Sequence, residues 1–267
     1  MSDIIRVTDL SAPELLPFTD TSELRLKNEL DIFVAESPKV VRTALDSGYE
    51  PLSLLVSEKY ISGQASDIIA RCGGIPVYTA PDIRLEELTG FRFTQGVMCV
   101  LKRKPQPALS VVLSDAVRVA VLEDIMNQTN IGAIFRSAAA LGFDAVLLTK
   151  GCSDPLFRRT VRVSMGAVMQ IPWAYLAEQP PGYVHALHDA GFSVAAMALS
   201  ENSISVDDPR LSAEQKLAVL IGTEGTGLRK ETVAAADHVV KIPMHNGVDS
   251  LNAAAASAVA FWALTRA

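Results

Sequence analysis

Three separated stretches contain polar and small residues at spacings that suit a ligand-binding and catalytic site. The last is residues 241–262, in which a short apolar segment leads into a polar turn, H-N-G-V-D, and then into an alanine-rich run. Because alanine is the strongest helix former, we expect a helix over residues 252–264, capped by Asp249 or Ser250. Backbone N–H groups are unpaired at such a helix start and can hold a ligand. The alternative is an ordinary strand–turn–helix that closes an α/β domain.

The first stretch places Asn130 and Arg136 six residues apart, in N-I-G-A-I-F-R. We expect a helix over residues 131–141 that Asn130 caps, because apolar residues recur there at helical spacing. An arginine two turns into a helix that starts at the carboxyl end of a sheet can reach the ligand crevice. The alternative is an arginine that forms a surface salt bridge.

The second stretch is a glycine-rich loop, G-T-E-G-T-G at residues 222–227, between an apolar strand and a helix. Glycines let the backbone pass close to a ligand or adopt positive φ. The spacing is G-x-x-G-x-G, which differs from the G-x-G-x-x-G of dinucleotide-binding loops, and no basic residue takes the part of a P-loop lysine. The loop therefore disfavours a nucleotide-dependent oxidoreductase.

Residues from these stretches fall where loops of one sheet would gather. Gly222, Ile242 and Leu251 each lie at the end of a predicted strand or the start of a predicted helix. Loops gathered at one edge of a sheet form a compact pocket, which here would suit a small, partly apolar cofactor.

Apolar strands alternate with helices through the second half of the chain. Strands are expected at residues 118–122, 145–148, 194–198, 217–221 and 239–242, and helices at 131–141, 182–190, 228–235 and 252–264. Such alternation is typical of a parallel sheet covered on both faces.

The first half predicts a smaller α/β unit of about 100 residues, near the usual minimum for an independent domain. After a polar lead-in at 1–23, we expect helices from residue 23, at 40–45 and at 65–70, and strands at 52–56, 76–78 and 96–100. The segment K-R-K-P-Q-P at 102–107 is typical of a stiff linker, with a surface loop as the alternative. The predicted division is a domain at 1–104, a linker at 105–110 and a domain at 111–267.

Composition limits the class of protein. The chain has 267 residues, 49% of them hydrophobic, and a net charge of −6, so it lacks the overall basic character of many nucleic-acid binders, although a local basic face would suffice. Its three cysteines are far apart and suggest neither a disulfide framework nor zinc, and no metal site is expected. With no apolar signal core at the start and no run of membrane-spanning length, we expect a soluble cytoplasmic protein.

The three stretches together resemble the motifs of the SpoU (TrmH) family of RNA ribose 2′-O-methyltransferases, of the SPOUT class. The matching patterns are N-x-G-x-x-x-R-x-A, then I-G-x-E-G-x-G-L, then I-P-M…S-L-N before a small-residue helix, in the family's order over residues 118–267. The segment R-V-S-M-G-A at 162–167 is also similar to the family. Near the start, F-V-A-E-S at 33–37 loosely matches the family's F-x-x-E-G, with Ser37 in place of glycine.

The resemblance implies a fold, a cofactor and site residues. The expected fold is α/β: a C-terminal parallel-sheet domain with a C-terminal trefoil knot, which works as a homodimer, plus a small N-terminal α/β domain like a ribosomal protein that binds the substrate RNA. The implied cofactor is S-adenosylmethionine. Its implied contacts are Gly222, Thr223, Glu224, Gly225, Ile242, Met244, Ser250, Leu251 and Asn252. The implied catalytic residues are Asn130, Arg136, Glu224, Ser250 and Asn252.

The expected partner is structured RNA, rRNA in preference to tRNA, with neither DNA nor a membrane. Besides Arg136, two basic clusters are candidates for phosphate contacts. One consists of Arg158, Arg159 and Arg162, and the other includes Lys102 and Arg103. The alternative for both is solvated surface.

The role of Arg136 can be argued from its chemistry. A guanidinium has a pKa above about 12 and no acceptor when charged, so it suits a fixed charge beside a developing oxyanion better than a simple base. Glu224 either orients Arg136 or orders the glycine loop. The rival functions are a catalytically inactive RNA-binding relative and a base methyltransferase of the same class.

Overall fold

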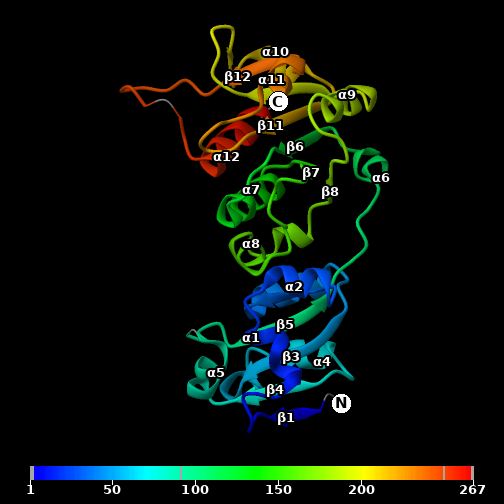
Figure 1. The fold of residues 1–267 in the computed structure, drawn as a ribbon, viewed down its shortest axis with the longest axis vertical. Helices are drawn as coiled ribbons and strands as arrows, with labels where there is room; N and C mark the ends of the chain where they lie inside the picture. The colour runs from blue at the N-terminus through cyan, green and yellow to red at the C-terminus, as the bar shows by residue number, and fades with distance from the viewer. Residues whose placement is uncertain (1–2, 91, 249, 266–267) are drawn as a thin grey trace. The chain divides into compact units, whose positions relative to one another are not determined.

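The computed structural model describes residues 3–90, 92–248 and 250–265, and the chain forms two compact units (Figure 1). The first consists of Met1–Pro105 with Leu156–Met169, and the second of Gln106–Pro155 with Gln170–Ala267. The segment Leu156–Met169, which we assigned from sequence to the second domain, thus packs with the first unit. The predicted functional division at 105–110 stays a prediction.

In the described part of the second unit, seven strands form one sheet in the order β10-β12-β9-β11-β6-β7-β8, and each neighbouring pair is parallel. The strands are β6 (Arg118–Leu122), β7 (Ala145–Leu148), β8 (Trp173–Tyr175), β9 (Ser193–Met197), β10 (Ile204–Ser205), β11 (Leu217–Ile221) and β12 (His238–Lys241). β6, β7, β9 and β11 are apolar and bury residues on both faces, as central strands of a parallel sheet must. The parallel sheet predicted from sequence is confirmed, and the short strands β8 and β10 were not predicted.

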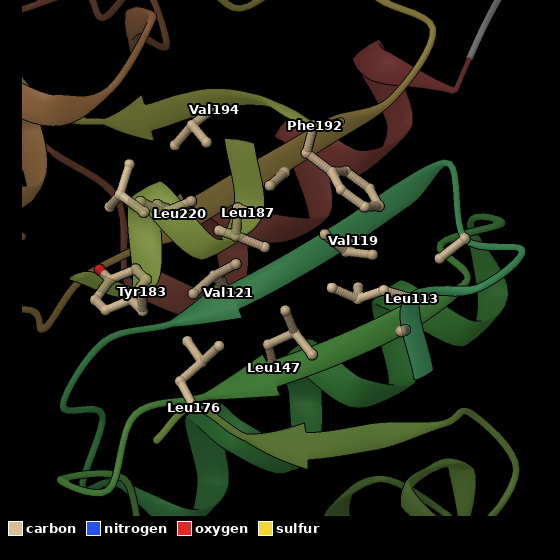
Figure 2. Close-up of a cluster of buried hydrophobic side chains, with 14 of the residues drawn as sticks. Leu113, Val119, Val121, Leu147, Leu176, Tyr183, Leu187, Phe192, Val194 and Leu220 are labelled. Atoms are coloured by element: carbon tan, nitrogen blue, oxygen red, sulfur yellow. The ribbon is translucent and has the colours of Figure 1, made fainter. Parts of the chain in front are cut away.

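The helices of this unit are α6 (Leu109–Leu113), α7 (Gln128–Ala140), α9 (Gly182–Asp189), α10 (Pro209–Ala213), α11 (Lys230–Ala235) and α12 (Ala253–Leu264). Figure 2 shows the core beneath α9, where Tyr183 and Leu187 meet Val119, Val121 and Leu220 of the sheet. Strand residues of the opposite parity face the other side, which α7 and α12 cover side by side (Figure 1).

Two predicted helix caps were wrong. Asn127 caps α7, because its Oδ1 accepts hydrogen bonds from the backbone N–H groups of Thr129 (2.9 Å) and Asn130 (3.3 Å), so Asn130 lies inside the helix. Asn252 caps α12 through Ala254 and Ala255, in place of Ser250. The other predicted cap, Asp249, lies outside the described residues.

The first unit contains a mixed sheet in the order β1-β4-β3-β5-β2. Its strands are β1 (Ile4–Arg6), β2 (Ile32–Glu36), β3 (Pro51–Ser57), β4 (Val77–Ala80) and β5 (Val97–Lys102). Its helices are α1 (Leu16–Thr19), α2 (Glu23–Asn28), α3 (Pro38–Asp46), α4 (Ser66–Arg71), α5 (Asp82–Thr89) and α8 (Arg158–Val163), with short 3-10 helices η1 (Pro13–Leu15), η2 (Glu58–Tyr60) and η3 (Ala167–Met169).

The predicted polar lead-in at the start is wrong over most of its length. β1 pairs with β4, and Leu15 and Phe18 are buried in the core of the first unit. Prolines interrupt the spacing of the apolar side chains in this stretch, so the apolar pattern does not indicate the short elements. Within residues 3–90, 92–248 and 250–265, no helix is both long and apolar enough to cross a membrane.

The backbone conformation at Ser37 explains why the family motif has glycine at this position. Its backbone has φ 88° and ψ 147°, a region that only glycine adopts readily, and its hydroxyl caps α3 by accepting a hydrogen bond from Val40 N–H (3.3 Å). The serine therefore combines a strained backbone with a favourable cap.

We expect Ser37→Gly to leave the free energy of unfolding unchanged or to raise it by about 1 kcal/mol. Relief of strain of roughly 1–3 kcal/mol outweighs the few tenths lost with the cap and the roughly 0.4–1 kcal/mol from a more flexible unfolded chain. Ser37→Ala keeps the strain and loses the cap, so it should cost about 1 kcal/mol. Urea denaturation measures both, and a glycine variant less stable than the alanine variant would refute the assignment of strain.

Candidate active site

A cavity of about 630 Å³ opens beside the carboxyl end of β11 in the second unit. Small-molecule sites in proteins typically have about 300–1,000 Å³. Its walls come from the end of β9, the glycine loop, α11 and the start of α12. The lining residues are Ala198, Leu199, Ile221, Gly222, Thr223, Glu224, Gly225, Thr226, Gly227, Leu228, Lys230, Val233, Ala234, Ser250, Leu251, Ala253 and Ala256.

The three sequence motifs meet at the carboxylate of Glu224. Its Oε1 accepts a hydrogen bond from Asn130 Nδ2 (2.7 Å) and another from Asn252 Nδ2. Asn252 Nδ2 also lies 3.1 Å from Asn130 Oδ1. A helix interior, a loop and a helix cap, far apart in the sequence, are thereby tied at one point.

The helix to which each asparagine belongs fixes the position from which its amide donates to Glu224. Asn252 uses Oδ1 to cap α12, which leaves Nδ2 free to donate. Asn130 is 5% exposed on α7, so its amide has little competition from water. A hydrogen bond to a charged group contributes about 1.5–3 kcal/mol. Because Glu224 and Asn252 are exposed to water, the bond from the buried Asn130 contributes most to fixing the loop.

The glycine loop closes on itself. Gly227 N–H donates to Thr223 O (3.1 Å), and the hydroxyls of Thr223 and Thr226 are 2.8 Å apart. A Cβ on Gly222 would lie 2.3 Å from Gly227 C and 2.4 Å from Leu228 N, whereas a Cβ on Gly225 would meet nothing within 4 Å. Close backbone approach therefore requires glycine at position 222 and not at 225.

Of the other residues expected at a cofactor, Ser250 and Leu251 line the cavity, but Ile242 and Met244 are not among its lining residues. Sequence reasoning missed Ala198, Leu199, Lys230 and Val233. The position of Leu199 could have been found, because β9 ends next to β11 in a parallel sheet and its following residues must emerge at the same edge.

Arg136 lies two turns beyond the start of α7 and is exposed. Its guanidinium has no hydrogen bond or ion pair within the part of the chain that the structure describes. Since Glu224 accepts from the two asparagines instead, the geometry favours Glu224 as the residue that orders the glycine loop over a role in orienting Arg136.

The arginine cluster of α8 belongs to the first unit and is partly structural. Arg158 Nε lies 3.6 Å from Glu36 Oε2, Arg162 lies 3.8 Å from the same atom, and Arg158 N–H donates to Glu23 (3.0 Å). Burial lowers the pKa of Arg158, and the nearby carboxylates of Glu36 and Glu23 oppose that shift. Arg159 and Arg162 are exposed, so they are better placed than Arg158 to meet a large polyanion.

The second basic cluster is also anchored in the first unit. Lys102 ends β5, and the Arg103 N–H donates to Asp31 O (3.0 Å). Lys104 Nζ donates to Ser47 O (2.6 Å) and lies 4.6 Å from the centre of the Tyr49 ring. Residues 102–104 are thus part of the first unit, so the interpretation of residues 102–107 as a linker is wrong for these three residues.

The sequence and the fold are similar to those of known RNA methyltransferases. Residues 118–262 match the model of the SpoU rRNA Methylase family. An uncharacterized tRNA/rRNA methyltransferase of Mycobacterium bovis is 35% identical over 99% of this chain and 92% of its own length. A putative TrmH family tRNA/rRNA methyltransferase of Staphylococcus aureus is 29% identical over 85% of this chain and 92% of its own length. The crystal structure of an AdoMet-bound rRNA methyltransferase from Sinorhizobium meliloti superposes with a TM-score of 0.83 at 25% identity, covering 98% of both chains.

Substitution of the glycines tests the loop geometry. We expect Gly222→Ala to lower the free energy of unfolding by about 1–3 kcal/mol, because the loop must open to admit the methyl group. Gly225→Ala is the matched control and should change it by less than about 0.5 kcal/mol. Thermal unfolding of both variants distinguishes them; equal effects would show that the close approach at Gly222 does not exist in solution.

Proposed function

The chain belongs to the SpoU rRNA methylase family and is an RNA methyltransferase, and from this premise we propose that it transfers the methyl group of S-adenosylmethionine to a ribose 2′-hydroxyl of structured RNA. The observation that carries the proposal is the meeting of Asn130, Glu224 and Asn252 beside a cavity of cofactor size. A ribosomal RNA is the favoured substrate.

The cavity suits S-adenosylmethionine, the family's cofactor. Leu199, Ile221 and Leu251 give it apolar walls, and the glycine loop offers backbone N–H and C=O groups without bulky side chains. Small-molecule sites combine these two features, with a few placed polar groups for orientation. Thr223, Glu224 and Ser250 are such groups here. When bound, the cofactor supplies an already activated sulfonium methyl group.

The protein must then align the 2′-hydroxyl and stabilise the charge that develops on its oxygen. We assign alignment to Asn130, Ser250 and Asn252, because the asparagine pair is rigidly held around Glu224. Arg136 supplies a permanent positive charge that is not neutralised by a carboxylate of the described chain, and its planar fork suits a ribose phosphate. Exposed Arg159 and Arg162 and the cluster at Lys102 and Arg103 would bind RNA phosphates elsewhere.

The path of the chain supports a trefoil knot. β12 lies next to β9 in the sheet. The helix that follows it, α12, packs against α7, which is the helix that follows β6 in the chain. The chain between β12 and α12 must therefore return from beside β9 to the helix α7, and at the start of α12 Asn252 contacts Glu224 of the glycine loop. We propose that the chain between β12 and α12 passes through an earlier connection of the second unit and so forms the knot.

A homodimer is the proposed assembly. Val259 and Trp262, three residues apart on one face of α12, are 39% and 48% exposed, and Leu251 is 38% exposed. Apolar residues grouped on one helix face are typical of a self-association surface. We place the dimer contact on this face of the second unit.

Methyl transfer is tested directly by incubating the protein with isotopically labelled S-adenosylmethionine and total RNA, followed by digestion to nucleosides. The expected product is a 2′-O-methylated nucleoside from rRNA. A labelled base would assign the protein to base methylation, and cofactor binding without any transfer would make it an inactive RNA-binding relative.

For Arg136→Ala we expect a loss of about two to three powers of ten in the rate of transfer, because one transition-state charge contact contributes roughly 3–4 kcal/mol. Cofactor affinity, measured by calorimetry, should remain nearly unchanged, since Arg136 does not line the cavity. Arg136→Lys should restore little of the rate, because a point charge cannot replace the planar fork. A rate within about threefold of wild type in the alanine variant would remove Arg136 from the mechanism.

A further inference from the structure

Glu123 is a buried carboxylate to which none of the roles above is assigned. It follows β6 directly, only a short turn before α7, and is 1% exposed. Its backbone N–H donates to the carbonyl of Ile221 (2.9 Å), the last residue of β11, where the glycine loop begins.

The side chain of Glu123 reaches the other end of the same loop. Its Oε1 accepts a hydrogen bond of 2.6 Å from the backbone N–H of Arg229, the N-cap residue of α11 that immediately follows the loop. One residue therefore contacts the chain both where the loop leaves the sheet and where it enters the helix. Residues 222–228, with Glu224 among them, lie between these two contacts.

The second carboxylate oxygen of Glu123 has partners outside the loop. Oε2 accepts hydrogen bonds from Tyr183 Oη and Thr232 Oγ1, both at 2.5 Å (Tyr183 is labelled in Figure 2). Burial raises the pKa of Tyr183, and the bond to Glu123 adds to the shift, so the phenol remains a donor. A buried carboxylate needs such donors, because an unpaired one would be very costly.

Asp124, the next residue, also holds Arg229 at the end of the glycine loop. Its Oδ2 accepts from Arg229 Nε (3.0 Å) and Nη2 (2.5 Å), and its Oδ1 accepts from Thr149 Oγ1 (2.8 Å). The turn after β6 thus holds Arg229 by its backbone and by its side chain, and the same turn continues into the helix that carries Asn130.

We propose that Glu123 is a positioning residue of the active site, which holds the exit of the glycine loop so that Glu224 meets Asn130 and Asn252 and the cavity keeps its shape. The inference rests on the proposed function, because it assigns that cavity to S-adenosylmethionine. Glu123 acts through the loop and does not touch the cofactor. Without this anchor the loop samples conformations that do not bind, and the apparent affinity falls by the fraction of competent molecules.

Three variants separate positioning from general stability. Glu123→Leu removes both acceptors at similar volume. Glu123→Gln keeps one acceptor for Arg229 N–H, while its NH2 group can donate to the hydroxyls of Tyr183 and Thr232, which also accept. Thr232→Val is the matched control, since it removes a donor to the same carboxylate but not a contact to the loop.

The measurement is the dissociation constant of S-adenosylhomocysteine by calorimetry, with unfolding followed in parallel. We expect Glu123→Leu to bind at least about tenfold more weakly, the effect of losing a charge-assisted hydrogen bond, and Glu123→Gln to stay within about threefold of wild type. Thr232→Val should bind within about twofold even where its stability falls. Equal affinity in Glu123→Leu and Thr232→Val would overturn the proposal.

Should Glu123→Leu fail to fold, the backbone donor is removed instead. Arg229 is exposed and has φ −65°, the angle that proline prefers, so Arg229→Pro deletes the N–H at a tolerant position. Arg229→Ala keeps the N–H and is its control. At least tenfold weaker binding in the proline variant alone supports the anchor, and equal binding in both refutes it. If the wild type does not bind S-adenosylhomocysteine, the proposed function fails; if it binds and the variants do not differ, only the role of Glu123 fails.

Discussion

The carboxylate of Glu224 is the junction on which the site depends. Two side-chain amides, from Asn130 within α7 and Asn252 at the start of α12, donate to the same carboxylate oxygen. Because each donor is fixed by its own helix, the flexible glycine loop that carries Glu224 has one conformation that satisfies both. A carboxylate in this role orders the loop, and the exposed Arg136 is not part of this hydrogen-bonded junction.

The parallel sheet brings these groups together. In such a sheet all strands deliver their following loops to one edge, so β6, β9 and β11 place α7, Leu199 and the glycine loop beside one another. Small residues then allow the close approach: glycine at 222, where a Cβ would collide with the backbone, and alanines at 253 and 256 in the cavity wall. The apolar strands provide a rigid base for the glycine loop, which is tied at Glu123 and Glu224 to the neighbouring elements.

Strands with a long apolar run were predictable from sequence, and β6, β7 and β11 begin and end at the predicted residues. β8 and β10 were missed because they have three and two residues, too few to show a pattern. The cap of α7 was misplaced by three residues because Asn127 and Asn130 are equally good caps locally. Only the long-range bond to Glu224 shows that Asn130 is used elsewhere.

Charged residues were the least predictable part. Arg158, Arg159 and Arg162 form a basic run that is typical of a phosphate-binding surface, yet Glu36, far earlier in the chain, pairs with Arg158 and Arg162. The buried Glu123 has no local signal either, since its donors come from α9 and from the beginning of α11. Spacing can indicate which residue types are present in a motif, but their partners depend on the folded chain.

We propose that the glycine loop, tied at Glu224 to α7 and to the start of α12, forms the binding site for S-adenosylmethionine. A crystal structure of the protein with S-adenosylhomocysteine tests it most directly. We expect the ligand in the cavity lined by the glycine loop, Leu199 and Leu251, with the bonds from Asn130 and Asn252 to Glu224 retained. A ligand bound elsewhere, or a cavity that opens by breaking both of these bonds, would contradict it.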